Sequence, residues 1–177
     1  MKINKKKGIL FWVTGLSGSG KTSISKRIHK KIENLYGPTI IVSGDDLRNI
    51  FNFKSYSKLS REKLGIQYSN YAKFITDQKI NIIFAVVAMR NKIRNHNRKK
   101  ISNYLEIFID AKISNIIKSK KKKIYFKDKK NIVGLGIKSE LPKKPHIIIK
   151  NDFKKSIKTL SLELTSKIIS FLKKRYK

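Results

Sequence analysis

The chain has 177 residues, of which 40% are hydrophobic, and it carries a formal net charge of +32. We predict a single domain over residues 1–177, since this length supports a substantial core and the apolar share excludes a disordered chain. The absence of cysteine excludes a disulfide framework and a thiolate metal site. No segment approaches the roughly 18 apolar residues of a membrane span, and residues 1–7 are too polar for a secretory signal, so we expect a cytoplasmic protein without membrane contact.

The positive charge comes mostly from lysine, which is spread along the whole chain. Basic surfaces attract nucleic acid because binding releases counterions. Arginine, the better reader of phosphates and bases, is scarce, and aromatic residues are not interleaved with the basic clusters. We therefore expect nonspecific adhesion to nucleic acid rather than a nucleic-acid function.

The first predicted element is a buried strand over residues 9–13, an apolar run of strand length. It leads directly into G-L-S-G-S-G-K-T, which matches the phosphate-binding pattern G-x-x-x-x-G-K-[ST] at every defined position. A helix follows, since Ile24, Ile28 and Ile32 recur at helical spacing and Gly37-Pro38 ends the pattern. Strand, loop and helix form the setting in which this pattern binds nucleotide phosphates, so we predict a P-loop.

Each part of this loop has a predicted task. Its glycines let successive backbone N–H groups turn toward an anionic phosphate chain, and the helix that follows adds the positive end of its dipole. Lys21 would reach the β- and γ-phosphates of ATP and act in catalysis, and the Thr22 hydroxyl would bind Mg²⁺. ATP and Mg²⁺ are therefore the predicted cofactors, and the predicted binding residues are Gly15, Leu16, Ser17, Gly18, Ser19, Gly20, Lys21 and Thr22.

A second candidate site follows the next predicted strand, residues 39–43, in the sequence S-G-D-D-L-R. In open α/β sheets, ligands bind beyond the carboxyl ends of the strands, which is also where the P-loop would lie. Asp45 is predicted to take the proton of an acceptor hydroxyl or to hold a Mg²⁺-bound water. Arg48 would pair with an anionic substrate. The structural alternative is an aspartate helix cap followed by a surface arginine.

Three further strands are predicted at residues 80–87, 104–110 and 146–149, and an amphipathic helix at about 155–173 closes the chain. Apolar β-branched strands that alternate with helices indicate a parallel sheet covered on both faces. The predicted fold is thus α/β, a three-layer P-loop NTPase fold with a five-stranded parallel sheet and helices on both faces. Two basic segments, about 89–100 and 118–145, interrupt the pattern, and we predict lids that close over phosphates, with solvated loops as the alternative.

At these motifs the chain resembles the adenylylsulfate kinases, P-loop enzymes that transfer the γ-phosphate of ATP to the 3′-hydroxyl of adenylylsulfate. Residues 11–22 resemble the family's extended P-loop, and residues 43–48 are similar to its Asp-Gly-Asp-Asn-x-Arg motif. Weaker similarity continues through Arg61, residues 122–125 and 131–135, Glu140 and Pro142, so it spans nearly the whole chain.

The resemblance implies an acceptor site made by Asp45, Arg48, Tyr56 and Arg61, and lid roles for Arg94 and Arg98. The chain departs from the family on the acceptor side. The family's Glu-Asn-Ile-Arg-Arg is replaced by residues 63–67, K-L-G-I-Q, and its Ile-Ser-Pro by residues 87–89, V-A-M. The family has two phenylalanines that stack on the adenine of the acceptor. Tyr56 stands near the position of one, and Ile132, which stacks poorly, stands at the position of the other.

The sequence therefore predicts a kinase that transfers the γ-phosphate of MgATP to a hydroxyl of a small nucleotide-linked acceptor. Adenylylsulfate is the leading acceptor by resemblance, and cytidine diphosphoramidate, a precursor for capsule decoration, is the alternative that the altered acceptor motifs favour. A second alternative is a non-catalytic protein that binds nucleotides or polyanions. A homodimer is included among the expected partners.

Overall fold

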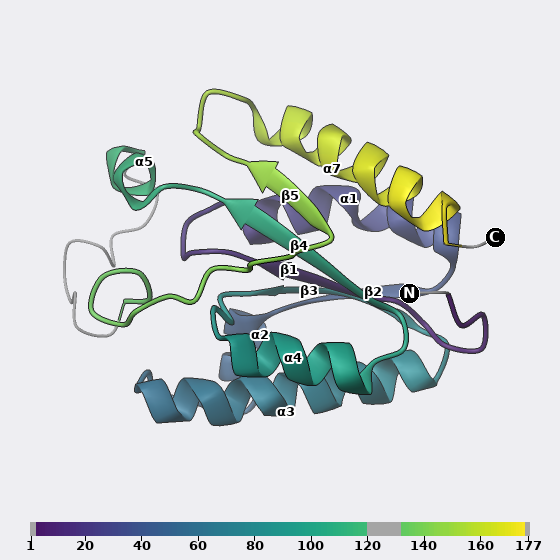
Figure 1. The fold of residues 1–177 in the computed structure, drawn as a ribbon, viewed down its shortest axis with the longest axis horizontal. Coiled ribbons are helices and arrows are strands. Elements are labelled where there is room, and N and C mark those ends of the chain that lie inside the picture. The colour runs from purple at the N-terminus through teal and green to yellow at the C-terminus, as the bar shows by residue number, and fades with distance from the viewer. Residues whose placement is uncertain (1–2, 120–131, 176–177) are drawn as a thin grey trace.

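Five parallel strands form the middle layer of the structure, in the order β2–β3–β1–β4–β5 (Figure 1). The computed structural model describes residues 3–119 and 132–175. The strands are β1 (Leu10–Thr14), β2 (Thr39–Ser43), β3 (Asn81–Val86), β4 (Tyr104–Asp110) and β5 (Ile147–Lys150). Each lies within a residue or so of its predicted range, and the predicted α/β fold is confirmed.

Helices cover both faces of the sheet, as Figure 1 shows. Helices α1 (Lys21–Tyr36) and α7 (Ile157–Lys173) pack on one face, around a core that includes Phe11, Ile28 and Leu164. The other face carries α2 (Gly44–Ile50), α3 (Lys58–Asp77) and α4 (Asn91–Lys100), whose core contains Trp12, Tyr68 and Phe84. The short helix α5 (Ile113–Lys118) follows β4. Among the described residues, no helix has the length and apolar character needed to cross a membrane.

The first predicted lid segment, 89–100, is mostly helix α4, which packs against α3. The contact is close at Gly65, where an added Cβ would lie 2.3 Å from Cδ1 of Ile93. The buried side chains of α4 itself are Ile93, Arg94 and Asn97, so the helix shows no apolar stripe in the sequence. The second predicted lid, 118–145, includes residues 120–131, which lie outside the described part of the chain, as does the motif at 122–125.

The carboxyl ends of β1, β2 and β3 lie at one edge of the sheet. Thr14, the last residue of β1, pairs with Val86 on one side and Phe108 on the other, and Ser43 pairs with Ala85. The P-loop, the start of α2 and the connection into α4 therefore emerge beside one another. This edge carries the candidate site.

Candidate functional site

The P-loop has a backbone that demands glycine at its first position. Gly15 has φ of 154°, and a Cβ there would lie 2.6 Å from the carbonyl oxygen of Ile109 and 2.9 Å from Ser19 Oγ. Gly20 caps helix α1 in the left-handed region with φ of 95°. Local contacts thus explain why the loop can wrap tightly between β1 and α1.

Within this loop, Lys21 is folded inward. It is 6% exposed, and Nζ donates a hydrogen bond of 2.7 Å to the Leu16 carbonyl oxygen, so the ammonium lies over the loop. Thr22 is exposed and lines a cavity that borders the P-loop. Ser19 Oγ is buried without a hydrogen-bond partner among the described residues and does not line the cavity.

Asn151 fastens the P-loop from the end of β5, and nothing in the sequence analysis pointed to it. Its Nδ2 donates 2.9 Å to the Ser19 carbonyl oxygen, its backbone N–H donates 2.7 Å to Asp110, and its Oδ1 accepts from the Phe153 N–H. The side chain is 3% exposed and lies against Gly20. The available signal was a polar residue directly after a strand, at the ligand edge of the sheet.

We expect Asn151→Asp to weaken ATP binding while leaving the fold in place. The change preserves shape but replaces the donor to Ser19 with a carboxylate that faces a carbonyl oxygen and adds negative charge near bound phosphates. The KM for ATP should rise by about tenfold or more. Asp152→Asn, one residue along and exposed, is the control, and an unchanged KM in Asn151→Asp would contradict the positioning role.

Helix α2 forms another side of the site, and a capping box holds its first turn. Ser43 Oγ accepts from the Asp46 N–H, and the Asp46 carboxylate accepts from the Ser43 N–H at 2.9 Å, a complete capping box. Asp46, the neighbour of the predicted residue, therefore does the capping. Asp45 is exposed and lines the cavity, so its carboxylate is available for chemistry.

Arg48, Tyr56 and Arg61 come together as predicted, although the arginines are held by the protein itself. The guanidinium carbons of Arg48 and Arg61 lie 4.2 Å and 5.1 Å from the Tyr56 ring centroid. Arg48 also donates to the Phe53 and Ser55 carbonyl oxygens, and Arg61 donates to that of Tyr56. Burial and the nearby Arg48 charge lower the pKa of Arg61. This cationic, aromatic cluster is suited to an anion that carries a flat ring.

One cavity of about 720 Å³ joins the two walls. Its volume lies within the range of about 300–1,000 Å³ that is usual for ligand-binding cavities. Gly15, Leu16 and Ser19 are buried and do not line this cavity. The predicted residues on its surface are Ser17, Gly18, Gly20, Lys21, Thr22, Asp45, Arg48, Tyr56 and Arg61, and Ile132 lines it as well.

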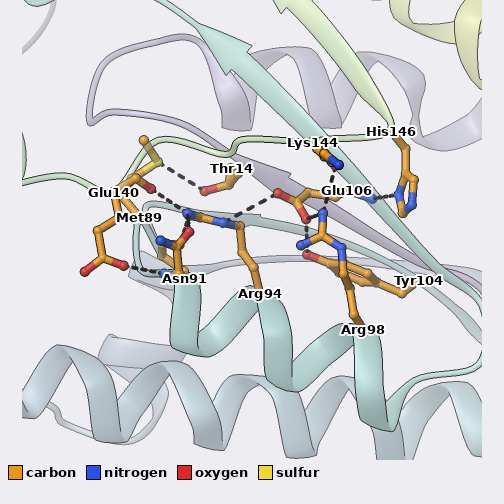
Figure 2. Close-up of polar contacts among 11 residues, drawn as sticks. Thr14, Met89, Asn91, Arg94, Arg98, Tyr104, Glu106, Glu140, Lys144 and His146 are labelled. Atoms are coloured by element: carbon orange, nitrogen blue, oxygen red, sulfur yellow. Dashed lines mark hydrogen bonds and ion pairs between the residues drawn. The ribbon is translucent and has the colours of Figure 1, made fainter.

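The structure corrects the predicted lid role of Arg94 and Arg98, which do not line this cavity. Arg94 is 1% exposed and pairs with the fully buried Glu106 of β4, with Nε 3.6 Å from Oε1. Arg98 Nη2 lies 2.5 Å from the other carboxylate oxygen, to which the Tyr104 hydroxyl also donates (Figure 2). Burial raises the pKa of Glu106 above its ordinary value, and the nearby charges of the two arginines offset only part of that rise. A carboxylate inside the molecule needs these partners, so the arginines are structural.

Comparison with known proteins agrees with this geometry. The family model for adenylylsulphate kinase matches residues 7–150. The chain belongs to the adenylylsulphate kinase family. It is 33% identical over 143 residues to a cytidine diphosphoramidate kinase of Campylobacter jejuni, a match that covers 78% of this chain and 84% of that one. It is 31% identical over 181 residues to an adenylyl-sulfate kinase of Clostridium acetobutylicum, covering 97% and 86%.

A solved structure shares the fold of this kinase-family chain. The Mycobacterium tuberculosis APS kinase CysC in complex with AMPPNP and APS superposes with a TM-score of 0.80 at 23% sequence identity, over 92% of this chain and 98% of that one. The predicted class of enzyme, a nucleotide kinase that phosphorylates a hydroxyl, is thereby confirmed.

Proposed function

We propose that this chain transfers the γ-phosphate of MgATP to a hydroxyl of a nucleotide-linked acceptor, and that cytidine diphosphoramidate is its preferred acceptor. The acceptor oxygen would bond to the γ-phosphorus as the bond to the bridging oxygen of ADP breaks, and the hydroxyl proton would leave. The observation that carries the choice of acceptor is Ile132, buried in the cavity wall where the family resemblance implies a phenylalanine.

The described residues suit MgATP on their own geometry. The tight turn at Gly15 and the inward ammonium of Lys21 make an anion cradle. Thr22 would hold Mg²⁺, which when bound supplies positive charge against the phosphates. Lys21 would stabilise charge on the transferring group, and Asp45 would orient or deprotonate the acceptor hydroxyl.

Arg48, Arg61 and Tyr56 would receive the acceptor's base and anionic groups. A purine acceptor would stack on Tyr56 and find an aliphatic side chain opposite, losing a contact worth about 1–3 kcal/mol per stacked base. A pyrimidine has a smaller face and loses less. The similarity to the Campylobacter kinase supports the same choice.

Adenylylsulfate is the second candidate acceptor. The family match and the 31% identity to an adenylyl-sulfate kinase support it. Tyr56 and both arginines would still serve this acceptor, since the cluster recognises charge and a flat ring rather than one base.

The test is ADP release from MgATP with each acceptor in moderate salt, in wild type and in Ile132→Phe. We expect a kcat/KM at least about tenfold higher for the cytidine acceptor, and Ile132→Phe should shift the ratio toward adenylylsulfate by restoring a stacking ring. A ratio that favours adenylylsulfate in wild type would replace the first candidate with the second. Turnover of neither, with salt-sensitive binding of RNA, would favour the polyanion-binding alternative.

A further inference from the structure

Three arginines at a spacing of four residues, Arg90 at the N-cap of α4 and Arg94 and Arg98 within it, each pair with a carboxylate on a neighbouring element. Arg90 Nη2 lies 2.6 Å from Glu62 of α3, and Nε donates to the same oxygen. Arg94 and Arg98 pair with Glu106 of β4, as Figure 2 shows. Arg94 and Arg98 lie one turn apart on the same face of α4, and Arg90 is the N-cap residue that precedes the helix.

The same arginines also hold the segment that returns toward β5. We call residues 132–144 the strap. Arg90 Nη1 lies 3.0 Å from the Glu140 carboxylate, Arg94 donates 2.6 Å to the Glu140 carbonyl oxygen, and Arg98 donates 2.9 Å to that of Lys144. The backbone N–H of Asn91 donates to the Glu140 carboxylate as well (Figure 2). These arginines thus hold the strap at Glu140 and Lys144, in its C-terminal part.

The strap forms one wall of the cavity, and α3 begins the opposite one. Ile132, Val133 and Ile137 of the strap line the cavity, as do Arg61 and Arg90. Glu62 follows Arg61 directly, so the chain of charges Glu62, Arg90, Glu140 runs from one wall to the other. Side-chain exposures of 21%, 19% and 33% leave these groups partly shielded from solvent, which strengthens their attraction.

We propose that Arg90 is a positioning residue for the acceptor, because its ion pairs with Glu62 and Glu140 set the separation of the α3 wall from the strap wall. This inference rests on the proposed function. Ile132 and Val133 of the strap pack in one cluster with Leu16 of the P-loop, but Asn151 also fastens that loop from β5, so loss of Arg90 should act mainly on the acceptor half of the cavity. The Arg94 side chain is buried beside Glu106, so replacing it would disturb the core. The Arg90 side chain is more exposed, so it can be replaced without unfolding the core.

The experiment compares Arg90→Gln with wild type for the KM of acceptor, the KM of ATP and kcat. We expect the acceptor KM to rise about tenfold in Arg90→Gln, with the ATP KM nearly unchanged and partial recovery in Arg90→Lys, which keeps the charge. Glu62→Gln and Glu140→Gln should each raise the acceptor KM, and each should add little in the Arg90→Gln background. Asp77→Asn, which breaks partly exposed ion pairs to Lys7 and Lys73 at the far end of α3, is the control.

Hydrogen exchange of the amides in residues 132–144 gives a readout that needs no acceptor. Faster exchange there in Arg90→Gln, with Asp77→Asn unchanged, is expected. Unchanged exchange, or an equal rise in both KM values, would overturn the positioning role. If wild type turned over neither acceptor while the strap exchanged faster in Arg90→Gln, the proposed function would fail and the link between the walls would stand.

Discussion

Replacement of Lys21 by alanine should lower kcat by about 10²–10³-fold, the effect of removing one preorganised group that stabilises transition-state charge. The ammonium is already inside the loop, 2.7 Å from the Leu16 carbonyl oxygen, so little reorganisation is needed when phosphates bind. Phosphoryl transfer depends mostly on such electrostatic stabilisation. Initial-rate measurements of ADP release at saturating MgATP check the result.

The fold should survive the change at Lys21. The site is at the first turn of α1, where alanine is a good helix former, and the apolar contacts of Ile24, Ile28 and Ile32 remain. Lys30→Ala, on the exposed face of the same helix, is the matched control and should keep full activity. A loss below about tenfold in Lys21→Ala, equivalent to about 1.4 kcal/mol, would remove the P-loop lysine from the mechanism.

The features that were predicted correctly from the sequence are those that produce local sequence patterns. The apolar runs of the strands mark the sheet. The motif that begins at Gly15 follows β1 directly, and the motif that begins at Ser43 starts on the last residue of β2, so sequence position alone puts them at one edge. Each of these features depends on residues within a few positions of one another. No tertiary contact was needed to find them.

The missed features depend on partners far apart in the chain. The family resemblance implied a lid role for Arg94, whereas its partner in the structure is Glu106 on the neighbouring strand β4. Asn151 acts on Ser19, 132 positions away, and Arg90 joins Glu62 to Glu140. Arginine in a sequence indicates a charge, and only the packing decides whether that charge meets a ligand or a buried carboxylate.

Asp45→Asn is expected to lower kcat by about 10²–10⁴-fold, the range for loss of a general base. Asparagine preserves the shape of the side chain but cannot accept the acceptor's proton and binds a Mg²⁺-held water more weakly. The neighbouring Asp46→Asn is a near-ideal control, because it makes the same chemical change one residue away in a side chain that caps α2. That variant should lose some stability and keep its kcat, and equal losses of kcat in the two variants would contradict the assignment of Asp45.

The pH dependence and the Mg²⁺ dependence of the residual Asp45→Asn rate distinguish the two roles predicted for this carboxylate, which are proton transfer and ordering of the metal. A group that takes the proton leaves a variant whose rate climbs with pH, since hydroxide replaces the missing base. A group that orders the metal leaves a variant whose rate climbs with Mg²⁺ concentration instead. Because Asp46 already satisfies the backbone at the start of α2, Asp45 has no capping duty, and its exposed carboxylate is the acidic group that the cavity presents on this wall. Either dependence would therefore report on the reaction rather than on the helix.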